Sequence, residues 1–169
     1  MQPSRMKRIP RHLFYPRWLT ARAFPGPVMA RIAKAVAESE QGHACEIRFV
    51  VEGALDFVPL VRRQTARERA LEVFSSLYVW DTEANNGVLV YLLLADRDVE
   101  ILADRGFNGR VEWSEWKEIC AEMQAHFARG DFEQGTLAGI ARIDALARRH
   151  FPLAGGVNPN ELPDAPAVL

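Results

Sequence analysis

The sequence predicts an α/β protein, a three-layer α/β/α sandwich with a small mixed β-sheet flanked by helices. Three observations predict it. Residues 88–95 form a continuous apolar run with no 3.6-residue period, which is typical of a strand buried on both faces. Residues 46–52 alternate as a strand does, and residues 58–78 between the two runs have a helical period. Because a strand, a helix and a neighbouring strand form a βαβ unit, the two strands are expected to be parallel with a right-handed crossover.

The chain totals are those of one ordinary globular domain. It has 169 residues and a net charge of -1, enough length for a sizeable core. The balanced charge argues neither for nor against nucleic acid, and we expect no nucleic-acid partner. Cys45 and Cys120 lack metal-ligand spacing and fit buried thiols in a reducing compartment, with a disulfide or a nucleophile as alternatives.

No transmembrane segment or signal peptide is expected. No apolar run approaches the roughly 20 residues that span a bilayer. Prolines and charged residues interrupt any apolar region near the N-terminus. We therefore expect a cytoplasmic location, with a membrane-peripheral position as the alternative.

Residues 1–26 are predicted to be a basic and aromatic arm. Two interpretations stay open. The arm is either solvated, with its aromatic rings packed onto the domain, or it docks on an anionic surface, either membrane headgroups or an unknown protein partner. Its prolines argue against a long amphipathic helix before Pro27. The basic and aromatic residues are Arg5, Lys7, Arg8, Arg11, Arg17 and Arg22, with Phe14, Tyr15, Trp18 and Phe24.

The domain itself is expected over residues 27–151. Pro27 suits the first turn of a helix that Gly42 closes. After the central strand, Asp96, Arg97 and Asp98 form a tight turn, and a second hairpin strand follows over residues 99–103.

Two helices then complete the domain. Ser114 is the expected N-cap of the first, Gly130 ends it, and Asp131 caps the second, which continues to His150. Residues 152–169 are rich in Pro and Gly with little to bury, so we expect a mobile tail.

The acidic residues fall into two groups by topology. The loop entering the central strand is expected to meet the exit of the next, antiparallel strand, which brings Asp81 and Glu83 close to Asp104. Asp96 and Asp98 lie at the far edge, where we interpret them as turn-formers. Carboxylate, amide and carbonyl oxygens are the ligands of hard cations such as Ca²⁺ or Mg²⁺. The predicted metal ligands are Asp81, Glu83, Asn85, Asn86 and Asp104, and the alternative is that Asn85-Asn86-Gly87 is turn chemistry alone.

Other catalytic constellations are weak or absent in the sequence. The four histidines have no metalloprotease spacing, no serine lies in a nucleophile elbow, and no cysteine-phosphatase loop occurs. Cys120 is expected on the apolar face of a helix, which disfavours its thiolate.

The order of elements and several short motifs resemble the TPM domain family over roughly residues 27–150. The motifs are Glu46-Ile47-Arg48-Phe49-Val50, Asn85-Asn86-Gly87-Val88-Leu89, Asp104-Arg105-Gly106 and the stretch from Phe127 to Gly135. The resemblance implies an α/β/α sandwich with an acidic cleft that binds divalent cations, calcium among them. It also implies the acid phosphatase activity reported for plant members.

Two functions are consistent with this sequence. The first is a binding or assembly module that presents its cleft and arm to a partner, with any cation structural or regulatory. The second is a metal-assisted phosphomonoester hydrolase, in which Asp81 and Asp104 hold the cation and Arg105 stabilises phosphate charge. Asn85 or Asn86 would then orient the metal. We favour the first, because the sequence offers no obvious general base near the predicted site.

Overall fold

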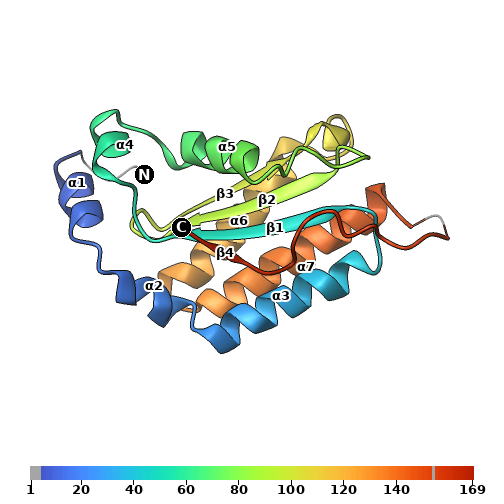
Figure 1. The fold of residues 1–169 in the computed structure, drawn as a ribbon, viewed down its shortest axis with the longest axis horizontal. Coiled ribbons are helices and arrows are strands. Elements are labelled where there is room, and N and C mark those ends of the chain that lie inside the picture. The colour runs from blue at the N-terminus through green and yellow to red at the C-terminus, as the bar shows by residue number, and fades with distance from the viewer. Residues whose placement is uncertain (1–4, 154) are drawn as a thin grey trace.

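The structure is a computed structural model that describes residues 5–153 and 155–169, and it contains a four-stranded mixed sheet in the order β3-β2-β1-β4 (Figure 1). β1 (Glu46–Glu52) and β2 (Gly87–Leu93) are parallel, and β3 (Asp98–Ala103) runs antiparallel to β2. β4 (Ala167–Val168) adds a short parallel pairing on the other side of β1. The predicted parallel pair and hairpin are confirmed.

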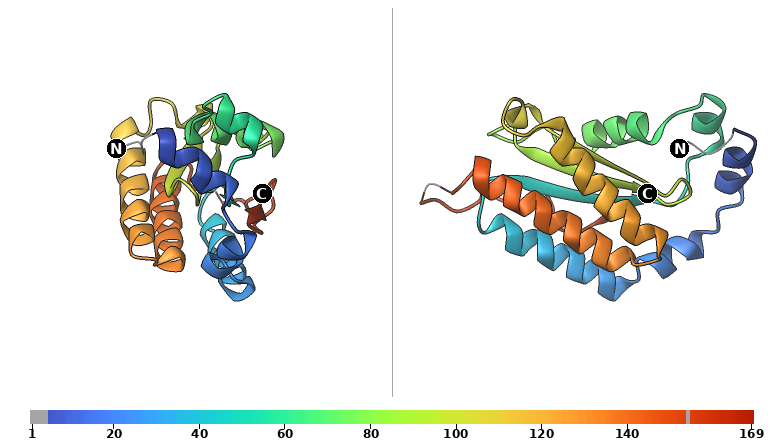
Figure 2. Two further views of the ribbon diagram at one scale, coloured as in Figure 1. Left: turned by 90° about the vertical axis from the view of Figure 1, so that its left-hand side faces the viewer. Right: turned by 180° about the vertical axis from the view of Figure 1, so that it is seen from behind.

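Helices cover both faces of this sheet (Figure 2). α3 (Gly26–Glu40), α6 (Trp113–Ala128) and α7 (Phe132–His150) lie on one face, and α5 (Ala66–Ser76) lies on the other. The strands contribute alternate residues to the two cores, which is the period-two geometry of a strand. Ile47, Phe49 and Val51 pack into the three-helix side with Val88, Val90 and Leu92, and Val50, Leu89, Tyr91 and Leu93 pack into the other. The three-layer α/β/α sandwich is confirmed.

The predicted helix over residues 58–78 is wrong in its continuity. Two helices occur instead, α4 (Phe57–Val61) and α5, separated by a turn in which Arg63 has a φ of 61°. Thr65 begins α5 with a reciprocal cap, because its Oγ1 accepts the N–H of Glu68 and the Glu68 carboxylate accepts the N–H of Thr65. This capping box begins a new helix after Thr65, so the apolar spacing on both sides of it belongs to two helices and not to one.

The N-cap predicted at Ser114 is also displaced. α6 begins at Trp113, with Glu112 at the cap position, and the Glu112 N–H donates to the Glu115 carboxylate. Near the N-terminus, the proline-interrupted arm folds as two short helices, α1 (Arg5–Leu13) and α2 (Arg17–Ala23).

Both interpretations of the arm find some basis in its packing. Tyr15 and Phe24 pack against the main core, and the Phe24 ring lies 5.7 Å from that of Phe49. Phe14 and Trp18 remain exposed to solvent, at 79% and 59%.

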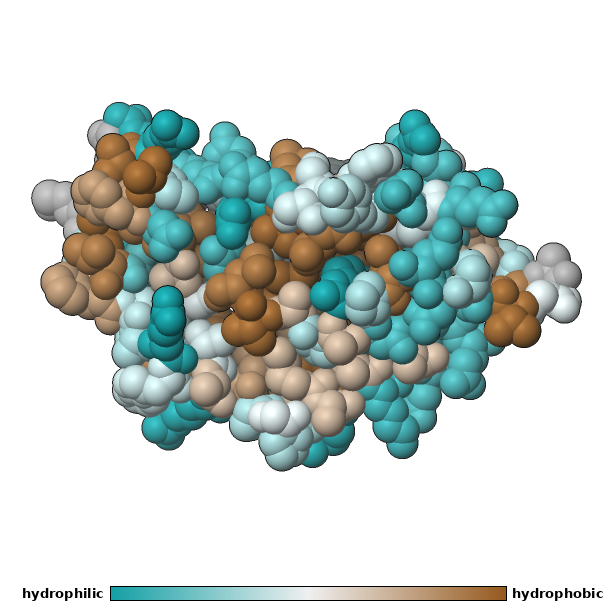
Figure 3. Space-filling view, in the orientation of Figure 1, coloured by the Kyte–Doolittle hydropathy of each residue, from teal (hydrophilic) through white to brown (hydrophobic). Residues whose placement is uncertain are grey.

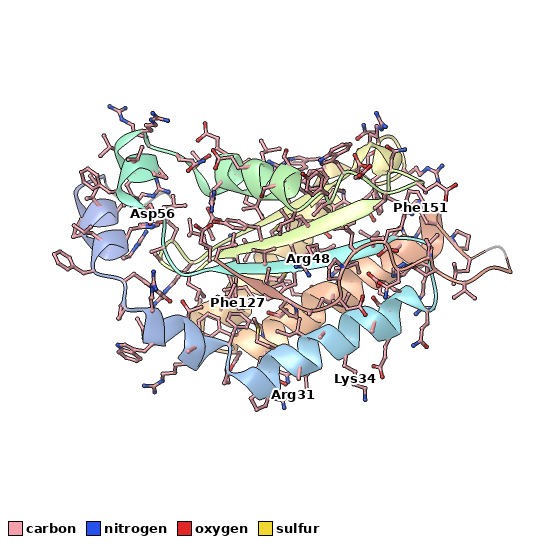
Figure 4. All side chains as sticks on the ribbon, in the orientation of Figure 1. Arg31, Lys34, Arg48, Asp56, Phe127 and Phe151 are labelled. Carbon is pink, nitrogen blue, oxygen red and sulfur yellow. The ribbon has the colours of Figure 1, made fainter. Side chains whose placement is uncertain are left out.

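The C-terminal residues differ from the mobile tail expected from their composition. Residues 155–169 run along the outer side of β1, where the labelled Arg48 contacts them (Figure 4). The Arg48 guanidinium donates to the carbonyls of Pro163 and Ala165, and the Asn158 amide donates to the carbonyls of His43 and Cys45. Composition missed this because hydrogen bonds hold most of the tail, and Leu162 is its one buried apolar side chain among residues 155–169. The tail covers a sheet edge that would otherwise present unpaired backbone groups.

Candidate functional site

The sheet has two ends that differ in their chemistry. The loop end consists of loop 81–86, residues 104–106 and the start of β1. The hairpin end consists of the turn 94–97 together with α1 and α4. In Figure 1 these lie at opposite ends of the long axis. The predicted metal ligands belong to the loop end, and Asp96 belongs to the hairpin end.

Asn85 joins the two segments of the loop end, as the topology predicted. Arg105 Nε donates to Asn85 Oδ1 at 2.6 Å, and the Gly106 N–H donates to the Asn85 carbonyl at 2.8 Å. Asn85 has a φ of 53°, a left-handed conformation that asparagine tolerates better than most residues. A Cβ at Gly106 would lie 2.4 Å from the Asn85 carbonyl oxygen, so this approach requires glycine.

Asp104 has one satisfied and one unsatisfied carboxylate oxygen. Its Oδ1 accepts the Arg105 N–H at 2.7 Å, and its own N–H donates to the Gly87 carbonyl at 2.9 Å. Its Oδ2 is buried and has no hydrogen-bond partner among the described residues. Buried polar atoms are nearly always paired, so a water or an ion is the usual explanation for such an oxygen.

Asn86 is buried at the loop end, and its N–H groups hold the loop in place. Its side-chain amide donates to the Ala44 carbonyl, and its N–H donates to Thr82 Oγ1 at 3.0 Å. These bonds tie the loop to the segment preceding β1, on the opposite side of β2 from β3. Asn86 therefore shapes the loop, and its side-chain Oδ1 is buried without a hydrogen-bond partner among the described residues.

Asp81 and Glu83 are exposed at the loop end. The Asp81 N–H donates to the Tyr78 carbonyl, and the Glu83 N–H donates to the carboxylate of Glu161 at 3.1 Å. Glu161 belongs to the C-terminal tail, so the folded tail adds a carboxylate that the sequence did not point to. Among residues 5–153 and 155–169, no group of three or more His, Cys, Asp or Glu side chains is arranged to hold a metal ion. A cation at this end would therefore have few protein ligands and complete its shell with water.

Sequence analysis also missed a second set of carboxylates beside the loop end, Glu40, Glu46 and Asp164. Glu40 and Glu46 are buried at the end of α3 and the start of β1. Glu40 Oε1 accepts the Ile47 N–H at 2.8 Å, and Glu46 Oε2 accepts the Leu162 N–H at 3.1 Å. Glu46 Oε1 is buried without a partner among the described residues. Only the tertiary fold brings Asp164 to them, which is why spacing in the sequence gave no signal.

Two of these groups, Glu40 and Glu46, have raised pKa values. The pKa of Glu40 is raised to about 9, mainly by burial and in part by the neighbouring Glu46 and Asp164, although the Ile47 N–H opposes the shift. Burial also raises the pKa of Glu46. Glu40 is therefore a neutral carboxylic acid at pH 7.

Asp96 at the hairpin end is surrounded by cations instead. Arg8 Nε donates to its Oδ2 at 2.9 Å, and Arg11 binds its Oδ1. His12 Nε2 lies 3.0 Å from Oδ1, and its Nδ1 accepts the Leu55 N–H. Burial opposes ionisation, but the contacts from His12 and Arg8 outweigh it and lower the pKa of Asp96. Asp96 lies in the hairpin turn, as interpreted from the sequence, and it also anchors α1 to the hairpin.

Asp98, two residues further along, has no such set of cations. Its carboxylate accepts from the Gln124 amide at 3.0 Å and from the Val99 N–H. Burial raises the pKa of Asp98, and the Val99 N–H opposes that shift. Asp98 therefore links the hairpin to α6 without an ion pair to the arm.

The two thiols and the His43 imidazole are not poised for nucleophilic chemistry. Burial raises the pKa of both cysteines, to about 11 for Cys120. Burial lowers the pKa of His43, whose Nδ1 accepts the Cys45 N–H. Both thiols are free, and Cys45 is buried while Cys120 is partly buried.

An open hollow of about 670 Å³ lies near the hairpin end, away from the predicted metal ligands. Arg22, Arg97, Asp131 and Glu133 contribute its charged lining, and Leu94 and Phe132 are among its apolar residues. Its opposed charges show no preference for one class of ligand. It lies closer to α2 than to the loop end, so it does not enlarge the predicted site.

Comparison with known proteins places the chain in a family. The model of the TPM domain matches residues 21–146. A solved structure, that of the BA42 protein from the psychrophilic bacterium Bizionia argentinensis, superimposes with a TM-score of 0.75 and 26% sequence identity. The match covers 86% of this chain and 95% of the BA42 chain. No curated protein sequence matches. The match to the family model covers most of the sequence, and the chain therefore belongs to the TPM domain family.

Proposed function

We propose that this TPM-domain protein is a binding module whose loop end takes up one divalent cation, Ca²⁺ or Mg²⁺. The observation that carries the proposal is the buried Oδ2 of Asp104, an acceptor without a donor in the segment predicted to hold the metal. A cation would satisfy that oxygen. Removing a carboxylate oxygen from water without a partner is otherwise costly.

The chemistry of the surrounding groups supports a hard cation. The exposed carboxylates of Asp81 and Glu83 belong to the facing loop, and the tail adds Glu161 beside Glu83. All are oxygen donors, which Ca²⁺ and Mg²⁺ prefer. Because no complete side-chain cage is present, water would supply the remaining ligands, as it commonly does for Mg²⁺.

Arg105 limits which oxygen atoms of the loop end can bind a cation. Its guanidinium occupies Asn85 Oδ1, so a cation that used this oxygen would have to displace a positive charge. We therefore assign Asn85 the role of holding the loop against Arg105. The carboxylates and the unpartnered Oδ1 of Asn86 remain the candidate ligands.

The geometry favours binding over catalysis. A phosphomonoester hydrolase needs an activated nucleophile or a general base. The cysteines have raised pKa values, and His12 and His43 are buried in structural contacts. One observation keeps the hydrolase as a second candidate: Arg105 adjoins Asp104 and is exposed, as a phosphate-binding residue beside a metal ligand would be.

Thermal unfolding titrated with Ca²⁺, Mg²⁺ and Mn²⁺ tests the proposal. A cation at about 100 times its dissociation constant stabilises the fold by roughly 2.7 kcal/mol, a clear rise in midpoint. The rise should be saturable, weakened by Asp81→Asn and lost in Asp104→Asn. Asp56→Asn, at the hairpin end, is the matched control and should keep the full rise.

The outcomes separate the two functions. The absence of a rise with any cation would overturn the metal proposal and leave the loop as turn chemistry. Asp104 Oδ1 also caps Arg105, so Asp81→Asn, which removes no hydrogen bond of the described fold, keeps the test valid if Asp104→Asn is unstable. Cation-dependent hydrolysis of p-nitrophenyl phosphate, lost in Arg105→Gln with the fold intact, would instead establish the hydrolase.

A further inference from the structure

Half of the large apolar side chains that are exposed in the described residues gather at the hairpin end. We call this group the end surface. α1 and the turn after it, α2 and α4 contribute it, and the apolar area over α1 and α4 is visible at the left of Figure 3. Its members are Ile9, Leu13, Phe14, Trp18, Phe57, Val58 and Val61.

The local structure turns these side chains outward together. Ile9 and Leu13 are four residues apart on α1, and Phe57, Val58 and Val61 form the outer face of α4, while Leu60 points into the core. α1 is fixed beside α4 by two contacts, the His12 bond to the Leu55 N–H and the arginine bonds to Asp96. The end surface is therefore a built feature of the fold.

The charge around the end surface is strongly one-sided. Segments 5–25 and 53–65 contain one acidic residue, Asp56, which is labelled in Figure 4. They contain these basic residues: Arg5, Lys7, Arg8, Arg11, Arg17, Arg22, Arg62 and Arg63. Asp96 neutralises part of this charge through Arg8 and Arg11, but Arg17, Arg22, Arg62 and Arg63 are all exposed. The chain as a whole has a net charge of -1, so this excess is local.

We propose that the end surface docks on the anionic face of a lipid bilayer, with its aromatic and aliphatic side chains in the headgroup region and its arginines on lipid phosphates. Exposed apolar patches of this kind mark interaction sites, and aromatic rings favour the membrane interface. Basic residues near anionic lipid add attraction that depends on salt. Neither the cation at the loop end nor any catalytic activity is part of this proposal.

The charge argues against a second copy as the occupant. A symmetric dimer through this surface would place the same basic patch of both copies face to face. Like charges brought together in this way repel. An anionic surface removes that penalty.

The structure also resolves the objection that prolines raise against membrane docking. No long amphipathic helix is needed, because three short helices present the apolar side chains together. In the described part of the chain, no helix is long and apolar enough to cross a membrane. The docking proposed is therefore peripheral, as for other interfacial surfaces that combine basic and apolar groups.

Sedimentation of the full chain with vesicles tests the proposal. Vesicles of phosphatidylcholine alone are compared with vesicles containing 30% phosphatidylglycerol, in EDTA so that no cation bridges protein and lipid. We expect binding to the anionic vesicles alone, falling as NaCl rises from 50 to 500 mM. Arg62→Gln with Arg63→Gln should lower partitioning about 25-fold, since each charge contributes roughly fivefold.

Apolar and control variants complete the test. Phe14→Ser with Phe57→Ser should lower partitioning at least tenfold, because each exposed ring enters the interface. Val157→Ser, at a valine that is 91% exposed near the tail, and Lys34→Gln on α3 are matched controls that should bind as wild type does. Circular dichroism verifies that every variant is folded.

Three outcomes would overturn the proposal. The first is no binding to anionic vesicles, and the second is binding that the end-surface variants leave unchanged. The third is a concentration-dependent dimer, lost in the Phe14→Ser/Phe57→Ser variant, without vesicle binding, which would assign the surface to a second copy.

Discussion

Both ends of the sheet have buried carboxyl groups nearby, but the surroundings favour the ionised form at one end and the protonated form at the other. At the hairpin end, Arg8, Arg11 and His12 surround Asp96 and keep it ionised. At the loop end, Glu40, Glu46 and Asp164 have one another as neighbours, and Glu40 retains its proton instead.

The difference separates structural acids from candidate functional ones. The negative charge of Asp96 holds α1 in place through its ion pairs. The carboxyl groups at and beside the loop end are not matched in this way, and both Asp104 and Glu46 keep an oxygen without a partner in the described chain. Unmatched, desolvated acids are where ligands and protons have most to contribute.

The largest effect is expected from Asp96→Asn, which removes the charge from the hairpin end. Breaking a buried pair by removing one partner leaves cations uncompensated, so we expect a loss of about 3 kcal/mol in the free energy of unfolding. Urea denaturation at pH 7 measures it. Asp98→Asn is the control and should cost far less, because burial raises the pKa of Asp98 and its charge is not stabilised. Equal losses would contradict the comparison.

The pH dependence of this variant provides a second measurement. The contacts from His12 and Arg8 lower the pKa of Asp96 below its unfolded value of about 3.9, despite its burial. Its contribution is therefore present above pH 4 and lost as the pH falls. The wild type should lose stability on acidification more steeply than Asp96→Asn.

Glu40→Gln tests whether folding stability depends on pH in the opposite direction beside the loop end. Because the pKa of Glu40 is raised to about 9, the folded state binds a proton that the unfolded state releases. Wild-type stability should therefore fall as the pH rises from 5 toward 9, by up to about 1.4 kcal/mol per pH unit. Glutamine keeps the acceptor for the Ile47 N–H and cannot ionise, so the variant should be more stable at pH 8. Chemical denaturation across this range measures it.

The matched control for that prediction is Glu38→Gln, an exposed acid two residues away on α3. It should leave the pH profile unchanged. A Glu40→Gln profile with the wild-type slope would show that Glu40 is ionised in the folded protein, and the contrast between the two ends would be lost.

A smaller effect is expected from Arg48→Gln, which weakens the tail that covers the loop-end acids. Arg48 donates to two tail carbonyls, and a hydrogen bond of this kind contributes about 1 kcal/mol. Hydrogen exchange at the Leu162 and Leu169 amides should accelerate about fivefold. Arg31→Gln on α3 is the control, because its partner is Glu133 and it should leave these rates unchanged. Unchanged exchange in Arg48→Gln would contradict the tail contact.

The smallest effect is expected from Asp81→Asn without a cation. Asp81 is exposed, and surface substitutions of this kind usually change stability by less than about 0.5 kcal/mol. Calorimetry in EDTA should therefore give the wild-type midpoint. A large loss in EDTA would show that Asp81 has a structural role, and it would no longer serve to test the metal site.

Sequence patterns determined the fold class, because the periods of strands and helices depend on residues that are close together in the sequence. The apolar run at residues 88–95 predicted the central strand, and the predicted antiparallel hairpin of β2 and β3 placed Asn85 next to Arg105. The predicted fold class and family are confirmed. The predicted metal ligands stay a proposal.

Only the tertiary structure decided how each buried charge is balanced. Nothing local distinguishes Asp96, which receives cations from an arm more than 80 residues earlier, from Glu40, which is placed with Asp164 by the folding of the tail. The same holds for the end surface, where three short helices combine side chains that no single period connects. Burial and charge pairing depend on distances in space between segments remote in sequence, and these distances are set when the layers pack.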